Sequence, residues 1–507
     1  MLIKSFADEI QSFLGDASNL RGGEAQKVIL PKSAVDVSDI LREATISKTP
    51  VTISGAGTGT VGGRVPFGGV VLALDKLAQI KEISKADENG GRGIVQSGVI
   101  LADYQKAVAA KNLFYPPDPT EWSCQMGGTV ATNASGARSF KYGATRDFVE
   151  RLEIVLPTGE ILNLRRGDSV ADRDHKICLM AGAKQIQIQL PTYQMPDTRK
   201  HAAGYFVRSA MDAIDLFIGA EGTLGVVTEI ETKLLNAPEA VLSGIVFFKN
   251  ENNLLDFVGE AREKSFAARA EVGDRKPKIE NQIDARLLEY FDCRSLEFVA
   301  AKFPLIPENM AGAIFFEQEV TADAEENLLA QWFELLEKHC AEIEKSWFAA
   351  NESDARKMRE FRHALPVAVN EFIIRHGQRK ISTDMAVPDA RFPEMLRFYQ
   401  ETLRESNLNY VIFGHIGDCH LHVNMLPRDE QEAHRARQIY GRFIARALIV
   451  GGTISAEHGV GKLKKHYLEA MYGERYLNEM AIVKRALDPA GILNRGVMFD
   501  EKFLSLP

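Results

Sequence analysis

A glycine-rich loop follows a short apolar run near the N-terminus and restricts the fold. Residues 51–54 are typical of a strand, and residues 57–62 match the GxGxxG pattern of dinucleotide-binding proteins. In the Rossmann fold a helix begins at this loop and directs its N-terminus at the pyrophosphate. Three glycines and a proline at 63–69 leave no room for a helix before the next strand at 70–74. The sequence therefore excludes the Rossmann fold, but favours a phosphate-binding loop over a plain hairpin.

Two further segments are built from unusually small residues. They cover residues 124–137 and 219–228. Side chains of this size cannot form a core by themselves, so the backbone must approach something closely. A flat ligand and a tightly packed backbone crossing both fit this pattern.

Strands and helices are expected in both halves of the chain. In the first half the expected strands are residues 28–31, 51–54, 152–156, 215–219 and 226–235, and the expected helices are 36–47 and 102–111. In the second half helices at 251–266, 324–345, 354–371 and 392–406 alternate with strands at 313–316 and 410–413. The pattern predicts an α+β protein with a domain boundary near residue 240.

Composition limits the classes of function. With 507 residues, 45% hydrophobic and 26% charged, the chain is expected to form two or three globular domains. The net charge of −8 and the lack of a basic run argue against nucleic acid as a partner. The five cysteines show no CxxC spacing, which argues against disulfides and a built-in iron–sulfur cluster and suits the cytoplasm. No apolar run reaches the roughly 20 residues that span a bilayer, so only peripheral attachment to the inner face of the membrane stays open.

Histidines gather in residues 414–424, Gly-His-Ile-Gly-Asp-Cys-His-Leu-His-Val-Asn, and a Glu-His pair follows within Ser-Ala-Glu-His-Gly-Val-Gly-Lys at 455–462. Imidazole and carboxylate groups together are typical of a metal site. If the first stretch is extended, alternation places His420 and His422 on one face and makes them the natural ligand pair. Asp418 is then a turn residue and Cys419 belongs to the core.

These segments, in this order, resemble the flavin-binding domain of the vanillyl-alcohol oxidase/PCMH superfamily, and in particular its FAD-linked D-2-hydroxyacid dehydrogenases. That branch includes D-lactate dehydrogenase, D-2-hydroxyglutarate dehydrogenase and the D-type subunit of glycolate oxidase. The resemblance covers about residues 25–500 and rests on residues 54–59, 115–119, 127–136, 142–143, 218–225 and 487–494. It implies a PCMH-type FAD-binding domain of two α/β subdomains at 1–240, an α+β substrate-binding cap domain with the metal site at 241–480, and a segment at 481–507 that returns to the flavin.

The resemblance also implies the residues of each site. The expected contacts with non-covalently bound FAD, in strands and loops around its isoalloxazine ring, pyrophosphate and adenine, are Ser54, Gly55, Ala56, Gly57, Thr58, Gly59, Pro117, Asp118, Gly127, Gly128, Thr132, Asn133, Gly136, Tyr142, Glu221, Gly222, Gly225, Val226 and Asn494. The expected ligands of a divalent ion (zinc, manganese or iron(II)) are His415, His422 and Glu457, with His420 as a less favoured ligand. His458 is the expected general base, and Asn424 is expected to contact the substrate.

A 2-hydroxyacid carries a carboxylate, which an arginine can hold with two hydrogen bonds. Arg359 and Arg362 share a helix face in the segment that resembles the family's substrate arginine, and Arg362 is favoured narrowly. Relatives that act on dicarboxylates carry a lysine two residues before the aspartate of the next strand. Here that position is Ser382, ahead of Asp384, which favours a monocarboxylate such as D-lactate over D-2-hydroxyglutarate. Glycolate is a further alternative substrate within the same branch.

The implied reaction is the oxidation of the hydroxyacid to a 2-oxo acid. Hydride passes from C2 to flavin N5, His458 takes the hydroxyl proton, and the metal acts as a Lewis acid. Electrons then leave to a quinone, a cytochrome, an electron-transfer flavoprotein or an iron–sulfur subunit. A homodimer is one assembly that the sequence allows. Alternative hypotheses are a metallohydrolase, a non-redox flavoprotein of the alkylglycerone-phosphate synthase branch, and a binding protein with an inactive site.

Overall fold

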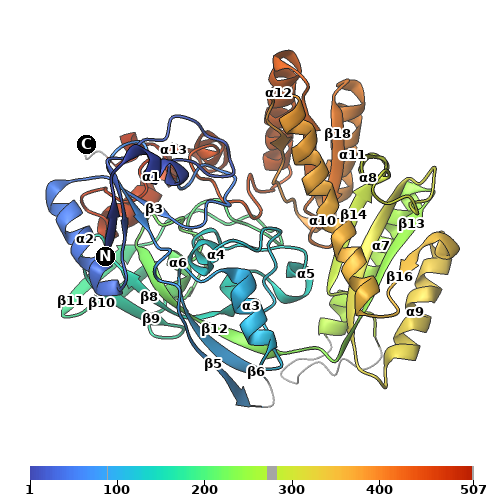
Figure 1. The fold of residues 1–507 in the computed structure, drawn as a ribbon, viewed down its shortest axis with the longest axis horizontal. Coiled ribbons are helices and arrows are strands. Elements are labelled where there is room, and N and C mark those ends of the chain that lie inside the picture. Colours follow the sequence, from blue (N-terminus) through green and yellow to red (C-terminus); the bar gives the residue numbers. More distant parts are fainter. Residues whose placement is uncertain (88–89, 271–281, 505–507) are drawn as a thin grey trace.

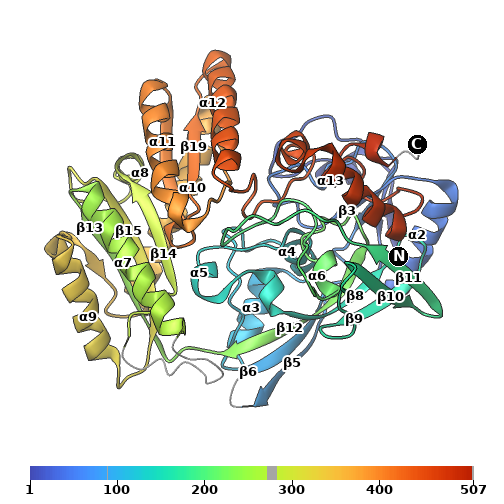
Figure 2. The same cartoon turned by 180° about the vertical axis from the view of Figure 1, so that it is seen from behind.

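The computed structural model describes residues 1–87, 90–270 and 282–504. Two bodies lie side by side, with the first half of the chain in one and most of the second half in the other (Figure 1). The last helix, α13 (Lys465–Leu487), leaves the second body and lies with the N-terminal elements, as the view from behind also shows (Figure 2). The α+β expectation is confirmed.

The first body contains two main sheets. A small sheet has the order β1-β2-β4-β3, from β1 (Leu2–Lys4), β2 (Lys27–Leu30), β3 (Val51–Ser54) and β4 (Val70–Ala73). β3 and β4 pair in parallel without a helix between them, as the glycines and the proline predicted. The helix α2 (Ala34–Ser47) packs its apolar face against this sheet.

A larger sheet has the order β5-β6-β12-β8-β9, with β7 (Leu113–Phe114) added beside β12. Its strands are β5 (Ile80–Asp87), β6 (Gly90–Gln96), β12 (Val226–Asn236), β8 (Val149–Val155) and β9 (Ile161–Arg165). The remaining elements are α1 (Ala7–Ile10), α3 (Leu101–Ala109), α4 (Met126–Thr132), α5 (Ser139–Tyr142), α6 (Ile214–Phe217) and the hairpin β10 (Lys176–Ala181) with β11 (Lys184–Gln189).

Two expectations for this body are wrong. Residues 215–219 form α6 and a turn, not a strand, because a short apolar run looks the same in a buried strand and a buried helix. The turn needs left-handed backbone at Gly219 (φ 84°) and Glu221 (φ 50°). Residues 126–132 form the helix α4 where strands and loops were expected around the flavin.

The second body is built on one antiparallel sheet of seven strands, ordered β16-β13-β15-β14-β18-β19-β17. They are β13 (Ala240–Phe248), β14 (Leu287–Asp292), β15 (Gly312–Val320), β16 (Trp347–Phe348), β17 (Ile381–Ser382), β18 (Asn409–Gly414) and β19 (His422–Leu426). Its helices are α7 (Glu251–Ala270), α8 (Cys293–Val299), α9 (Glu325–Lys338), α10 (Glu352–Arg375), α11 (Phe392–Glu405) and α12 (Glu430–Ile449).

Helices cover both faces of this sheet. Ile245 and Phe247 of β13 pack with the core that includes Phe361 of α10, whereas Val246 and Phe248 pack with the core that includes Phe257 of α7. A strand covered on both faces reads as a continuous apolar run, which explains the run Ile-Val-Phe-Phe at 245–248. β12 of the first body ends at Asn236 and β13 begins at Ala240. The division into residues 1–240, 241–480 and 481–507 stays a prediction.

Candidate active site between the two bodies

The central feature of the site is the Glu457 carboxylate, which lies between two histidines. Glu457 Oε1 is 3.3 Å from His415 Nε2 and 3.1 Å from His422 Nε2. The Glu457 side chain is 10% exposed and that of His415 is 3% exposed. Burial opposes ionisation of Glu457, but the Lys200 ammonium and His415 outweigh it and hold the pKa of this carboxyl well below its usual range. An ionised carboxylate facing two imidazole nitrogens is a donor set that suits a divalent ion.

The backbone between the two histidines is turned, not extended. A 3-10 turn at Ile416–Asp418 and a left-handed Cys419 (φ 53°) separate His415, at the end of β18, from His422, the first residue of β19. This turn ends before His420, whose ring centroid lies 4.6 Å from that of His422, so the prediction that these two rings lie on one side of the chain is confirmed. The turn lets the two outer histidines approach one carboxylate. Asp418 does lie in the turn, and Cys419 is buried, as expected.

His420 lies deeper, beside Asp384. It is fully buried, its Nε2 is 3.3 Å from Asp384 Oδ1, and neither ring nitrogen makes a hydrogen bond. Burial lowers the pKa of His420 to about 3, which keeps the ring neutral. Its ring nitrogens also come within ligand range of the other two histidines and Glu457.

A carboxylate that the sequence did not reveal orients His415. Glu289 of β14 accepts a hydrogen bond from His415 Nδ1 at 2.5 Å, which leaves Nε2 directed at Glu457. Glu289 also accepts from Arg362 Nε at 2.8 Å. Metal-bound histidines usually donate their second nitrogen to such a carboxylate, and this orients the ring. Arg362 thus lies next to the histidines, whereas Arg359 pairs with Glu352 at the exposed start of α10.

Asp384 organises the turn that carries Glu457 and His458. Its carboxylate accepts hydrogen bonds from the backbone N–H groups of both residues, from Ser455 Oγ at 2.6 Å and from Lys464 Nζ at 2.7 Å. His458 Nδ1 is 3.5 Å from Asp384 Oδ2, and its ring stacks on that of His422 at an interplanar angle of 8°. Burial lowers the pKa of His458 to about 4, so this imidazole is neutral and able to accept a proton.

The predicted phosphate loop has the features of an anion cradle. Within the described part of the chain, no backbone N–H group of residues 55–64 donates a hydrogen bond. Arg64 holds this loop in place. Its Nη1 donates a hydrogen bond to Gly55 O at 2.6 Å, and its guanidinium fills the space beside Gly57. Such a set of unused N–H groups fits a pyrophosphate.

Residues far apart in sequence close one side of this cradle. Asn494 accepts a hydrogen bond from Ile53 N at 2.8 Å and donates to Glu221 O at 2.7 Å. The Glu221 carboxylate in turn accepts from Val460 N at 2.7 Å and Gly461 N at 2.8 Å, just beyond His458. Burial raises the pKa of Glu221 to about 7. The structure therefore joins the phosphate loop, the 219–228 segment and the Glu-His turn.

The remaining predicted flavin residues lie on two segments. Asp118 is 3.4 Å from Arg138, and Asn133 ends α4 and accepts from Arg146 N at 2.9 Å. Tyr142 of α5 donates its hydroxyl to Glu319 of the second body. The backbone of Gly136 touches the chain that follows Pro117, and Gly127 packs on Ser97. The explanation by a tight backbone crossing therefore holds for these two glycines.

Gly128 borders open space that a ligand could fill, whereas Gly136 packs against protein backbone. A Cβ on Gly128 would meet no protein atom within 4 Å, whereas one on Gly136 would lie 1.8 Å from Asp118 O. We expect Gly128→Ala to fold normally and bind FAD about 10-fold more weakly, and Gly136→Ala to lose about 3 kcal/mol of unfolding free energy. Denaturant titration and flavin retention on gel filtration separate these effects. Equal FAD affinity in Gly128→Ala and wild type would show that this glycine does not face the cofactor.

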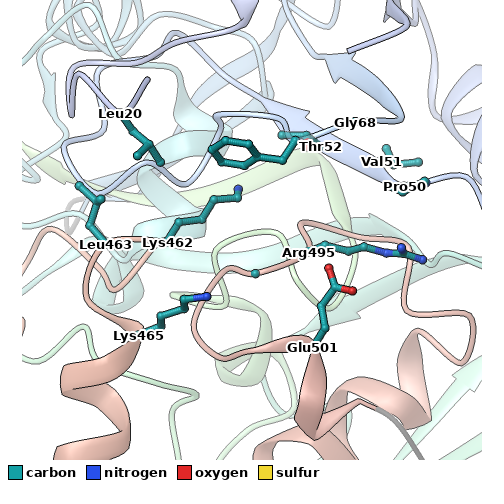
Figure 3. Close-up of a pocket in the computed structure, with 12 residues that line it drawn as sticks. Leu20, Pro50, Val51, Thr52, Gly68, Lys462, Leu463, Lys465, Arg495 and Glu501 are labelled. Atoms are coloured by element: carbon teal, nitrogen blue, oxygen red, sulfur yellow. The ribbon is translucent and has the colours of Figure 1, made fainter. Parts of the chain in front are cut away.

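A cavity of about 370 Å³ lies apart from the histidines. Figure 3 shows Thr52, Lys462, Lys465 and Arg495 around it, beside the turn that follows the Glu-His pair. Lys462 donates to Gly63 O at 3.1 Å, and Lys465 pairs with Asp500. None of the described residues that line this cavity is one of the predicted FAD, metal or substrate residues.

Comparison with known proteins agrees with this arrangement. Residues 25–165 match the family model "FAD binding domain", and residues 238–498 match "FAD linked oxidases, C-terminal domain". The chain is 30% identical to glycolate oxidase subunit GlcD of Bacillus subtilis over 93% of this chain and 88% of that protein. It is 29% identical to D-lactate dehydrogenase of Anaerostipes hadrus, over 96% and 93%, and 26% identical to D-2-hydroxyglutarate dehydrogenase of Stutzerimonas stutzeri, over 97% and 95%.

A solved alkyldihydroxyacetonephosphate synthase shares the fold at a TM-score of 0.64 and 16% identity, covering 97% of this chain and 82% of that one. The architecture is a PCMH-type FAD-binding domain followed by a C-terminal FAD-oxidase domain. No helix within the described residues has both the length and the apolar character to cross a membrane. The chain belongs to the FAD-linked oxidases and is an FAD-dependent oxidoreductase of the D-2-hydroxyacid dehydrogenase branch.

Proposed function

We propose that this protein is an FAD- and metal-dependent dehydrogenase that oxidises D-lactate to its 2-oxo acid. The observation that carries the proposal is the convergence of His415 and His422 on Glu457 Oε1, with His458 next in the chain and the flavin segment at Ser135–Gly136 alongside. Bound FAD supplies the two-electron oxidation, and a zinc, manganese or iron(II) ion on these three ligands supplies a Lewis acid. Electrons leave to an external acceptor.

His458 is the proposed general base. Asp384 faces its Nδ1, which favours the tautomer with the proton on that nitrogen and leaves the Nε2 lone pair available. His458 Nε2 is 4.0 Å from Glu457 Oε1, the carboxylate oxygen that also faces His415 and His422. A substrate hydroxyl beside the ion would therefore lie within reach of this nitrogen.

Arg362 and Asn424 are the proposed substrate-positioning groups. Glu289 accepts from Arg362 Nε, and among residues 1–87, 90–270 and 282–504 no other hydrogen bond is made by this guanidinium, so its two terminal nitrogens remain for a carboxylate. Asn424 lies two residues after His422 in β19 and therefore on the same face of that strand. These residues, with His458, form the catalytic group that we propose.

Ser382 supports a monocarboxylate substrate. It pairs with Asn424 across β17 and β19, so its position is at the edge of the site. Its short neutral side chain supplies no cation for a second carboxylate, whereas dicarboxylate-specific relatives carry a lysine there. We therefore place D-lactate ahead of D-2-hydroxyglutarate, with the monocarboxylate glycolate as the alternative.

The test is the absorbance spectrum of the purified protein before and after anaerobic addition of a hydroxyacid. We expect an oxidised flavin spectrum that D-lactate bleaches at least 10-fold faster than D-2-hydroxyglutarate or glycolate. L-Lactate is the matched control and should leave the colour unchanged. A colourless protein that still binds metal would point to a hydrolase, and a yellow protein that none of the acids bleaches would point to non-redox chemistry.

A further inference from the structure

The two oxygens of the Glu457 carboxylate have separate sets of partners. Oε1 faces His415 and His422 from the second body, as described above. Oε2 accepts a hydrogen bond from Ser135 Oγ at 3.1 Å and from Lys200 Nζ at 3.2 Å. Ser135 and Lys200 both belong to the first body, where Ser135 lies in the small-residue segment just before Gly136. One carboxylate thus joins the two bodies.

Lys200 is fixed in place by three acceptors. Its side chain is 2% exposed, and Nζ lies 2.9 Å from Gly136 O, 3.2 Å from Glu457 Oε2 and 3.4 Å from Asp418 Oδ2. Asp418 is itself held by Ser139 Oγ at 2.8 Å. The contacts with Gly136 and Glu457 are hydrogen bonds, and the contact with Asp418 is an ion pair. A buried ammonium held this way cannot turn towards a substrate.

We propose that Lys200 and Ser135 are positioning residues that occupy Glu457 Oε2 and keep this carboxylate a one-oxygen ligand. This inference rests on the proposed metal-dependent function. A 2-hydroxyacid offers a hydroxyl and a carboxylate oxygen, and an ion must have open positions to accept both. If Oε2 were released, Glu457 would be able to chelate the ion with two oxygens and fill one of those positions.

The direction of the effect on metal affinity follows from the charges. Hydrogen-bond donors and a nearby ammonium withdraw electron density from a carboxylate and repel a cation. Removing them makes Glu457 a stronger ligand, while Glu289 still orients His415 and Thr383 O still accepts from His422 Nδ1 at 3.1 Å. Metal affinity and substrate affinity should therefore change in opposite directions. A purely structural role for Lys200 predicts that both become weaker together with stability.

The experiment measures two constants in the flavin-loaded protein. The dissociation constant of Mn²⁺ is obtained by electron paramagnetic resonance, and the apparent dissociation constant of D-lactate is taken from the concentration dependence of anaerobic flavin reduction. For Lys200→Met we expect Mn²⁺ to bind at least as tightly as in wild type and D-lactate about 10-fold more weakly. Ser135→Ala, which removes one neutral donor and carries less risk of misfolding, should shift the D-lactate constant about 3-fold in the same direction.

Arg199→Gln is the matched control. Arg199 is the neighbour of Lys200 and also joins the two bodies, through Asp389 Oδ2 at 2.6 Å, but it touches none of the histidines or Glu457. This variant should leave both constants unchanged. An unchanged D-lactate constant, or weaker Mn²⁺ binding, in both Lys200→Met and Ser135→Ala would overturn the inference. If wild-type protein binds no Mn²⁺, or if D-lactate does not reduce its flavin, the proposed function fails instead.

Discussion

His458→Ala should retain bound flavin and metal yet reduce its flavin with D-lactate about 10²–10⁴-fold more slowly than wild type. The side chain holds none of the contacts that join the flavin segments, because Glu221 and Asn494 supply those contacts. Nor is it a proposed ligand, since Glu457 reaches the two other histidines. What the substitution removes is a neutral imidazole whose Nδ1 faces Asp384.

The measurement is anaerobic stopped-flow reduction at saturating D-lactate, with flavin and metal content determined on the same sample. His339→Ala is a suitable control, because this partly buried histidine pairs with Glu260 through Nε2 at 2.8 Å, in the second body and away from the site. It should reduce at the wild-type rate. Wild-type reduction by His458→Ala would disprove the assignment of the base.

Glu289→Gln should weaken metal binding 10- to 100-fold and also destabilise the fold by about 3–5 kcal/mol. Burial opposes ionisation of Glu289, but His415 and Arg362 outweigh it and hold its pKa far below the usual range. The amide removes the negative charge that balances Arg362 and orients His415. The two effects have separate causes, so they can be separated experimentally.

Glu317→Gln provides the comparison. Glu317 lies on the neighbouring strand β15, is 2% exposed and pairs with Arg286 at 3.2 Å, but it contacts no histidine. We expect a similar loss of unfolding free energy in denaturant titrations and an unchanged Mn²⁺ dissociation constant. If Glu289→Gln bound Mn²⁺ as tightly as Glu317→Gln, the role of Glu289 in orienting His415 would be refuted.

The sequence located the residues that come in motifs, and missed those that stand alone. His415, His422 and Glu457 share two short stretches, so their meeting could be expected from the resemblance. Glu289 left one usable signal, since a carboxylate within the buried six-residue strand β14 needs a charged partner. Lys200 left no signal, because its partner Glu457 lies 257 residues away and only the packing of the two bodies brings them together.

Local structure was predictable where the spacing of apolar residues and the positions of glycines indicated the same elements. The strands β3 and β4 and the lack of a helix between them were predicted, whereas their parallel pairing was not; α2 followed from its apolar stripe. The prediction failed for residues 215–219, where a short helix and a turn replace the expected strand. Left-handed backbone at Gly219 and Glu221 turns the chain there, and glutamate is not a residue type from which this conformation is expected.

The contacts of residues 493 and 494 with the strand β3 have a consequence for biosynthesis. Asn494 is hydrogen-bonded to Ile53, 441 residues earlier, and the neighbouring Leu493 forms a β-bridge with Val51. A ribosome must therefore synthesise the chain past residue 494 before the cradle beside the phosphate loop can close. We consequently expect tight cofactor uptake only after more than 400 residues that follow the loop have been made.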